Sequence, residues 1–155
     1  MNELKITNSN IIFNNLEINW KQLSVDEFLK GINSGYRIIK LEKEIVLYIV
    51  DEQGIRFWVS NNKIEQAELF IKKQEGNPKD YKIPENVYNG TITINDEEFK
   101  APIIINNFKN NQAIKIVKDP DSIQYGLNIY FVYLSERKYT LWVDKKDKEV
   151  TSFYF

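Results

Sequence analysis

Two stretches of this sequence, half a chain apart, resemble each other and constrain the fold more than any other feature. Residues 57–71 align without a gap with residues 141–155, an offset of 84 in a chain of 155 residues. Trp58 meets Trp142 in this alignment, and apolar residues meet at both ends of the stretch. A repeat of this length predicts two copies of one small α+β unit, and such units often form binding surfaces.

The composition is that of an ordinary globular domain. Hydrophobic residues make up 43% of the chain, charged residues 28% and aromatic residues 14%, which is enough apolar area to offset the entropy of ordering the chain. A chain of 155 residues is normally one domain. The net charge of −1 argues against a basic protein that binds nucleic acid and against a polybasic protein that binds membranes.

The residue types that most often carry catalysis are missing. The sequence has no cysteine and no histidine, which excludes disulfides, thiolate ligands, a cysteine nucleophile and the commonest general base. Paired carboxylates fall in predicted turns, where acidic residues are expected anyway: Asp51/Glu52, Glu97/Glu98 and Asp119/Asp121. We therefore expect no enzyme, no metal and no cofactor. An enzyme that uses only carboxylates, such as a glycosidase, is the lowest-ranked alternative.

The amino-terminal segment predicts a cytoplasmic protein. Residues 1–10 lack the apolar core of a signal peptide. No later run approaches the ~20 apolar residues that a membrane span needs.

Local signals predict two hairpins and one helix. Asn14-Asn15 separates two apolar runs within residues 11–18, and Asn95-Asp96 does the same within residues 91–99. Such pairs tolerate the positive φ of a tight turn. Ser24 with Glu27 forms a capping box ahead of an amphipathic helix that Gly31 or Gly35 would end.

The remaining apolar runs predict antiparallel strands joined by short turns. In the first half we expect strands at 36–41, 45–50, 55–59 and 64–71, and in the second half at 125–134, 138–143 and 149–155. Residues 110–117 correspond to the helix of the first half, although Ile114 to Ile116 also suits a strand. Residues 75–86 are polar and contain two prolines, which indicates an irregular linker. We therefore predict a single domain of residues 1–155, with similar halves at 1–74 and 87–155, each an antiparallel meander with a short helix.

Strand alternation separates a core face from a second face that mixes aromatic and charged side chains. Trp, Tyr and Arg supply much of the binding energy of protein interfaces, so this second face is the candidate partner-binding surface. The alternative is that the tryptophans pack the junction between the halves. The candidate contact residues are Arg56, Trp58, Glu68, Phe70, Trp142, Asp144 and Tyr154.

Three short segments resemble signatures of an uncharacterised bacterial domain family. Residues 50–57 (VDEQGIRF), followed by 61–64 (NNKI), resemble its central signature, and residues 87–95 (VYNGTITIN) resemble its second. Members of this kind are similar in architecture to the tandem-repeat β-lactamase inhibitor proteins and to small immunity proteins that neutralise bacterial toxins. This chain departs from the inhibitor proteins in having no cysteines.

The resemblance implies an antidote, or immunity protein, that binds a cognate bacterial toxin and occludes its functional site. Neither a nucleic acid nor a membrane is expected as a partner. A different reading of the same aromatic face is a module that binds a small ligand or a carbohydrate by stacking.

Overall fold

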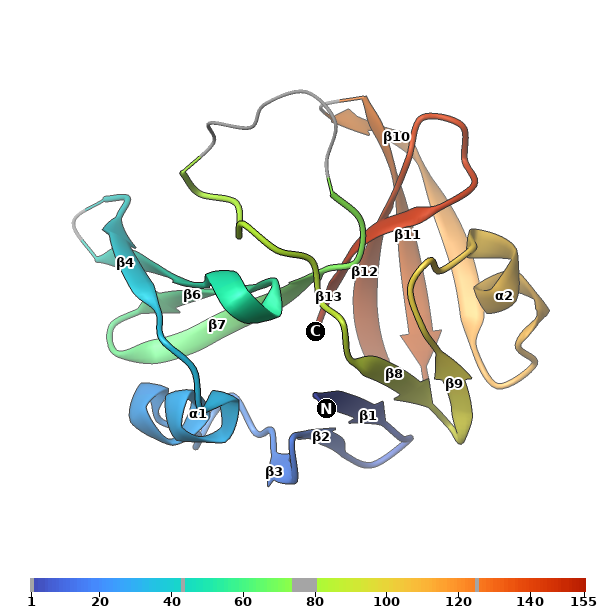
Figure 1. The fold of residues 1–155 in the computed structure, drawn as a ribbon. Coiled ribbons are helices and arrows are strands. Elements are labelled where there is room, and N and C mark those ends of the chain that lie inside the picture. The colour runs from blue at the N-terminus through green and yellow to red at the C-terminus, as the bar shows by residue number, and fades with distance from the viewer. Residues whose placement is uncertain (1, 43, 74–80, 125) are drawn as a thin grey trace.

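The computed structural model describes residues 2–42, 44–73, 81–124 and 126–155. It is mostly β, with two short helices, and is α+β in this broad sense (Figure 1). Five strands form a smaller sheet in the order β3-β2-β1-β8-β9, and eight form a larger sheet in the order β10-β11-β12-β13-β7-β6-β5-β4. Every pairing is antiparallel except β1 with β8, which is parallel.

The elements follow one another in this order along the chain. The first part contains β1 (Glu3–Ile6), β2 (Ile11–Phe13), β3 (Leu16–Glu17), α1 (Val25–Ile32), β4 (Arg37–Lys40), β5 (Ile45–Val50), a 3-10 turn η1 (Asp51–Gln53), β6 (Ile55–Ser60) and β7 (Lys63–Phe70). The second contains β8 (Thr91–Ile94), β9 (Glu97–Phe99), α2 (Ile105–Asn110), β10 (Lys115–Gln124), β11 (Leu127–Leu134), β12 (Arg137–Val143) and β13 (Val150–Tyr154).

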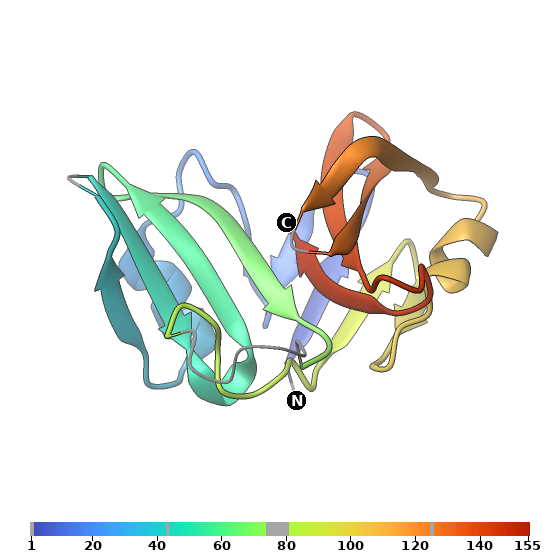
Figure 2. The same ribbon diagram turned by 90° about the horizontal axis from the view of Figure 1, so that it is seen from above.

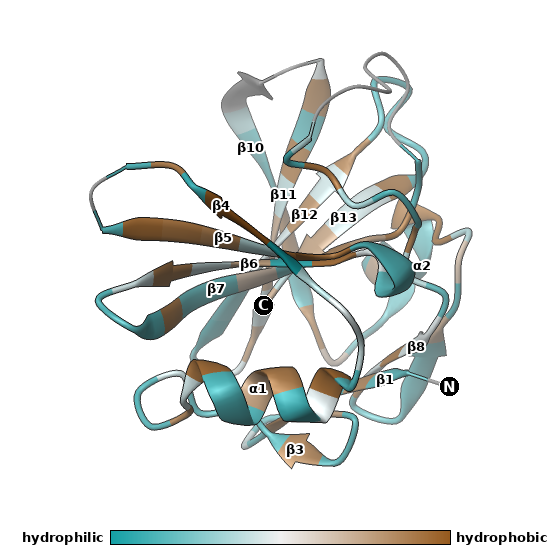
Figure 3. Ribbon diagram, turned by 60° about the vertical axis from the view of Figure 1, so that its left-hand side comes forward, coloured by the Kyte–Doolittle hydropathy of each residue, from teal (hydrophilic) through white to brown (hydrophobic). Residues whose placement is uncertain are grey.

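The two sheets and the helices enclose one hydrophobic core. The Phe28 ring of α1 meets the Phe57 ring of β6 edge-on at 5.0 Å and the Phe13 ring of β2 at 6.0 Å. Near α2, the rings of Phe99 and Phe108 stack at 4.4 Å. Figure 3 shows α1 with alternating hydrophobic and hydrophilic residues, as expected for a helix that buries one face.

The local signals for the two hairpins and for helix α1 predicted the presence of these elements correctly. Both hairpin turns have two residues with positive φ, 49° and 69° at Asn14 and Asn15 in the first. The Ser24 hydroxyl caps α1 by accepting from the Glu27 amide, and the Glu27 carboxylate accepts from the Ser24 amide. The predicted end of the helix is wrong, because Asn33, with φ 50°, takes the left-handed position after Ile32.

The prediction for residues 110–117 is wrong as a helix and right as a strand. The helix lies earlier, at Ile105–Asn110, and β10 begins at Lys115. Strand β1 was not predicted at all, because its four residues are ordered by long-range pairing with β2 and β8. The predicted linker has residues 75–80 outside the described part of the chain and residues 81–86 within it.

The centre of the larger sheet lies between β7 and β13. Leu69 pairs with Phe153, and on either side Glu68 pairs with Tyr154 and Phe70 with Ser152. Figure 2 shows strands β4–β7 and β10–β13 as two groups on either side of the carboxyl terminus. Neither α1 nor α2 approaches the length and hydrophobicity of a membrane-spanning helix, and the described residues contain no other candidate span.

Candidate partner-binding face

The larger sheet has an outer face, formed by the residues that alternate with its core residues. One row of neighbouring pairs on this face crosses all eight strands, and we call it the outer row. From β4 to β10 it reads Arg37, Ile49, Arg56, Glu68, Tyr154, Thr140, Phe131 and Val117. On β4–β7 the row consists of three charged side chains and the buried Ile49. On β10–β13 its four side chains are uncharged. The two groups of strands therefore differ in the chemistry they present.

An ion pair lies near the centre of the outer row. Arg56 Nε donates to Glu68 Oε2 at 2.5 Å, and Glu68 is fully buried. Burial raises the pKa of Glu68, while the charge of Arg56 and the hydroxyls of Tyr154 and Ser152 act in the opposite direction. Burying a carboxylate is costly unless it is paired with a cation. The ion pair with Arg56 therefore offsets the cost of burying Glu68.

Aromatic rings surround this ion pair. The Arg56 guanidinium lies 4.8 Å from the ring centroids of both Trp58 and Phe70. The Tyr154 ring stands between the two tryptophans, 6.0 Å from Trp58 and 5.8 Å from Trp142. Both tryptophans remain half-buried, whereas Phe70 and Tyr154 are buried. The outer face thus presents two accessible indoles on a preformed base.

Residues 81–88 form a strap that borders the outer face on the β4–β7 side, visible in Figure 1 as the yellow-green segment before β8. Arg37 donates to the carbonyls of Tyr81 and Ile83, and Arg56 Nη1 donates to the carbonyl of Lys82 at 3.0 Å. These bonds hold the chain across the sheet without using the strap's side chains.

Asp51 anchors the same strap from η1. Its Oδ2 accepts from Arg37 Nε at 2.6 Å, and its Oδ1 accepts from the Glu85 amide at 3.0 Å. Burial pushes the pKa of Asp51 upward, but the bonds from Arg37 and Glu85 outweigh it and lower the pKa below its usual value.

Six of the seven predicted contact residues lie together on the outer face: Arg56, Trp58, Glu68, Phe70, Trp142 and Tyr154. Asp144 lies apart, at the turn between β12 and β13. There its Oδ1 accepts from the Lys148 and Glu149 amides, and its carboxylate lies 3.6 Å from Lys72 Nζ. These contacts indicate that Asp144 stabilises the turn between β12 and β13.

Sequence reasoning missed the outer residues at both edges of the sheet. Arg37 was not singled out because its role depends on carbonyls more than 40 residues away. Phe131 and Val117 were missed because the pairing of β10 with β11 was not predicted. Strict alternation along residues 127–134 could have identified Phe131.

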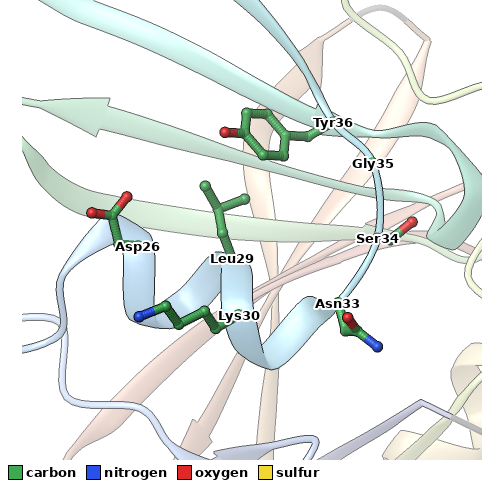
Figure 4. A pocket seen from close by; sticks show the side chains of 7 residues that line it. All are labelled: Asp26, Leu29, Lys30, Asn33, Ser34, Gly35 and Tyr36. Carbon is green, nitrogen blue, oxygen red and sulfur yellow. The ribbon is translucent and has the colours of Figure 1, made fainter.

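A shallow open pocket lies elsewhere, between α1 and the start of β4 (Figure 4). It has a volume of about 570 Å³ and is lined by Asp26, Leu29, Lys30, Asn33, Ser34, Gly35 and Tyr36. The Tyr36 side chain is 49% exposed and projects toward Leu29 across the pocket. An exposed ring beside polar groups is typical of sites that bind polar ligands.

Within the described residues, no cluster of three His, Cys, Asp or Glu side chains could hold a metal ion. Comparisons with protein-family models, with curated proteins and with solved structures found no match to this chain.

Proposed function

We propose that this protein is an antidote that binds a cognate bacterial toxin through the outer face and occludes the toxin's functional site. The observation that carries the proposal is the pair of half-buried tryptophans, Trp58 and Trp142, held on either side of Tyr154. Indoles placed on a rigid, largely desolvated base are typical of binding hot spots. The resemblance to immunity proteins supports the choice of a toxin as the partner.

Five of the seven predicted contact residues divide into two roles under this proposal. Trp58, Trp142 and Arg56 retain exposure and can touch a partner. Glu68 and Phe70 lie beneath them at 0% and 2% exposure and hold them in place. Preorganisation of this kind reduces the entropy that binding costs.

We further propose that the two halves are copies of one unit. The pairing of β7 with β13 supports this, because a shift of 84 residues exchanges the Glu68–Tyr154 pair with the Phe70–Ser152 pair. The backbone bond from Ile71 to Thr151 corresponds by the same shift to the bonds between Ala67 and Phe155. A duplicated unit would place the two indoles in related positions.

The test is capture of a partner by the tagged protein from a lysate of the organism that encodes it, followed by an assay of the captured protein's toxicity. We expect one stoichiometric partner whose toxicity is suppressed by the wild-type chain. Trp58→Ala and Trp142→Ala should each weaken binding by about 2 kcal/mol, or roughly 30-fold.

Tyr36→Ala is the matched control, because Tyr36 is an exposed aromatic residue in the pocket of Figure 4. It should leave binding unchanged. The proposal is wrong if folded Trp58→Ala and Trp142→Ala variants bind the partner as tightly as the wild type, or if the captured protein is not toxic.

A second candidate is a module that binds a small polar ligand such as a sugar. The observation that favours it is the pocket beside Tyr36, where Asp26, Lys30 and Asn33 offer hydrogen-bonding groups next to a ring. Calorimetric titration with a panel of sugars would test it. Binding that Tyr36→Ala abolishes and Trp142→Ala leaves intact would establish this candidate.

A further inference from the structure

Among the residues that the structure describes, the strap borders the outer row on the β4–β7 side of the sheet centre. Arg37 and Arg56 hold it by donating to its carbonyls. The positions at the same distance from the centre on the other side are Val117 and Thr140, which lack guanidinium groups. Ile49 on the strap side is fully buried, whereas Phe131, at the same distance on the other side, is only half-buried, and Val117 at the end of the row is 39% exposed. The β10–β12 side of the row is therefore the more accessible one.

Two parallel rows of side chains form this accessible region, which we call the second-half patch. The first row is the end of the outer row: Val117, Phe131 and Thr140. The second row lies two residues along each strand: Lys115, Tyr133 and Lys138. An apolar row thus lies beside a basic row, about 7 Å away, the distance between alternate residues of a strand.

The patch carries two exposed lysines, Lys115 and Lys138. Neither Lys115 nor Lys138 forms a salt bridge with a residue that the structure describes. Lys138 Nζ lies 3.6 Å from the centroid of the Phe131 ring, so the ammonium group is held over the apolar row by a cation–π contact. A carboxylate of a binding partner would therefore pair with an ammonium group that is already held in position.

We propose that the second-half patch binds an extended segment of the partner protein in which an apolar side chain and an Asp or Glu stand two residues apart. Alternate side chains of an extended segment share one side and are about 7 Å apart, which matches the separation of the two rows. The apolar side chain covers Val117 and Phe131, and the carboxylate pairs with Lys138 and Lys115. A second copy of this chain docked through the same patch would bring lysines against lysines, which is unfavourable.

This inference deepens the proposed function by naming the partner chemistry, and it is tested without the toxin. The probe is a phage-displayed library of random peptides of about a dozen residues, selected on the immobilised protein. Synthetic versions of enriched peptides are then titrated into ¹⁵N-labelled protein. The indole signals of Trp20, Trp58 and Trp142 report on the core, the strap side and the patch side respectively.

We expect enriched peptides with an apolar–x–acidic pattern that shift the Trp142 signal more than those of Trp58 and Trp20. Lys138→Glu changes an exposed side chain and should weaken binding about tenfold or more, as should Phe131→Ala. Tyr36→Ala should bind like the wild type. Native-like spectra of both patch variants establish that the loss is not unfolding.

The proposal is overturned if no peptide is enriched, if the enriched peptides lack carboxylates, or if Lys138→Glu binds them unchanged. It is also overturned if Phe131→Ala abolishes self-association seen by sedimentation, which assigns the patch to a second copy. Binding of a labelled oligonucleotide that Lys138→Glu abolishes would assign it to nucleic acid. A toxin captured without any effect of patch variants would leave the proposed function standing and refute only the patch.

Discussion

At the scale of single residues, Gly54 shows how tightly the strap fits against the sheet. It has φ 65°, and a Cβ built there would lie 2.3 Å from the Tyr88 amide nitrogen. We expect Gly54→Ala to lower the free energy of unfolding by at least about 2 kcal/mol, because strain of the left-handed backbone adds to a backbone clash. Gly35→Ala is the control, since nothing lies within 4 Å of its Cβ. Urea unfolding measures both, and equal stabilities would refute this account.

Asp51 is a residue whose lowered pKa makes stability depend on pH. A carboxyl group whose pKa is lower in the folded chain contributes stability above its unfolded pKa, and loses that contribution as the pH falls through the folded value. We therefore expect the free energy of unfolding to fall as the pH is lowered from about 5 to about 2, and to fall less in Asp51→Asn. Asp144 and Asp147, whose pKa values are also lowered, should account for part of the pH dependence that remains in Asp51→Asn.

Urea unfolding across this pH range provides the measurement. Glu52→Gln serves as a control on the neighbouring, exposed side chain. An Asp51→Asn variant with the same pH slope as the wild type would show that the bonds to Arg37 and Glu85 contribute nothing measurable.

Alternation predicted the outer face at residue level, but burial could not be predicted from the same pattern. The sequence placed Arg56, Trp58 and Glu68 on one face, as the structure does. The full burial of Glu68 follows from Tyr154, which arrives from β13 more than 80 residues later. A pattern of alternating residues carries no information on which strand will lie beside them.

At the scale of elements, the capping of α1 has a measurable consequence. The Ser24 hydroxyl accepts from the Glu27 amide, and Glu27 Oε2 accepts from the Ser24 amide at 3.0 Å. Ser24→Ala should lower the free energy of unfolding by about 1 kcal/mol, because one amide of the first turn loses its acceptor. Ser24→Asp, which can also cap, should recover most of that loss. The capping account fails if both variants are equally destabilised.

Elements with local signals were predicted and those without were not. The turns at Asn14-Asn15 and Asn95-Asp96 fix their hairpins through positive φ, which the residue types reveal. Helix α2 begins after Ile104, which offers no side-chain cap, and is held instead by bonds between residues 103–105 and 148–150. Its position is thus set by tertiary contacts, which explains why the sequence placed it too late.

At the scale of the whole molecule, both sheets cross the boundary between the two halves that the sequence predicts. Strand β1 pairs with β8 in the smaller sheet, and β7 pairs with β13 in the larger. Neither half retains a complete sheet when the other is removed. The sequence could suggest two similar halves from the alignment at Trp58 and Trp142, but it could not show that they share their sheets, because pairings between halves leave no periodic signal.

This shared architecture predicts that the chain unfolds as one cooperative unit. Fluorine-labelled tryptophan gives a separate signal for each indole. Trp20 and Trp58 precede the strap in the sequence, and Trp142 follows it. We expect all three native signals to disappear at the same urea concentration. Phe153→Ala, which empties a fully buried position at the β7–β13 junction, should cost about 3–5 kcal/mol and lower that concentration equally for all three. If the Trp142 signal disappears before that of Trp58, the halves unfold separately and the prediction of a single domain is wrong.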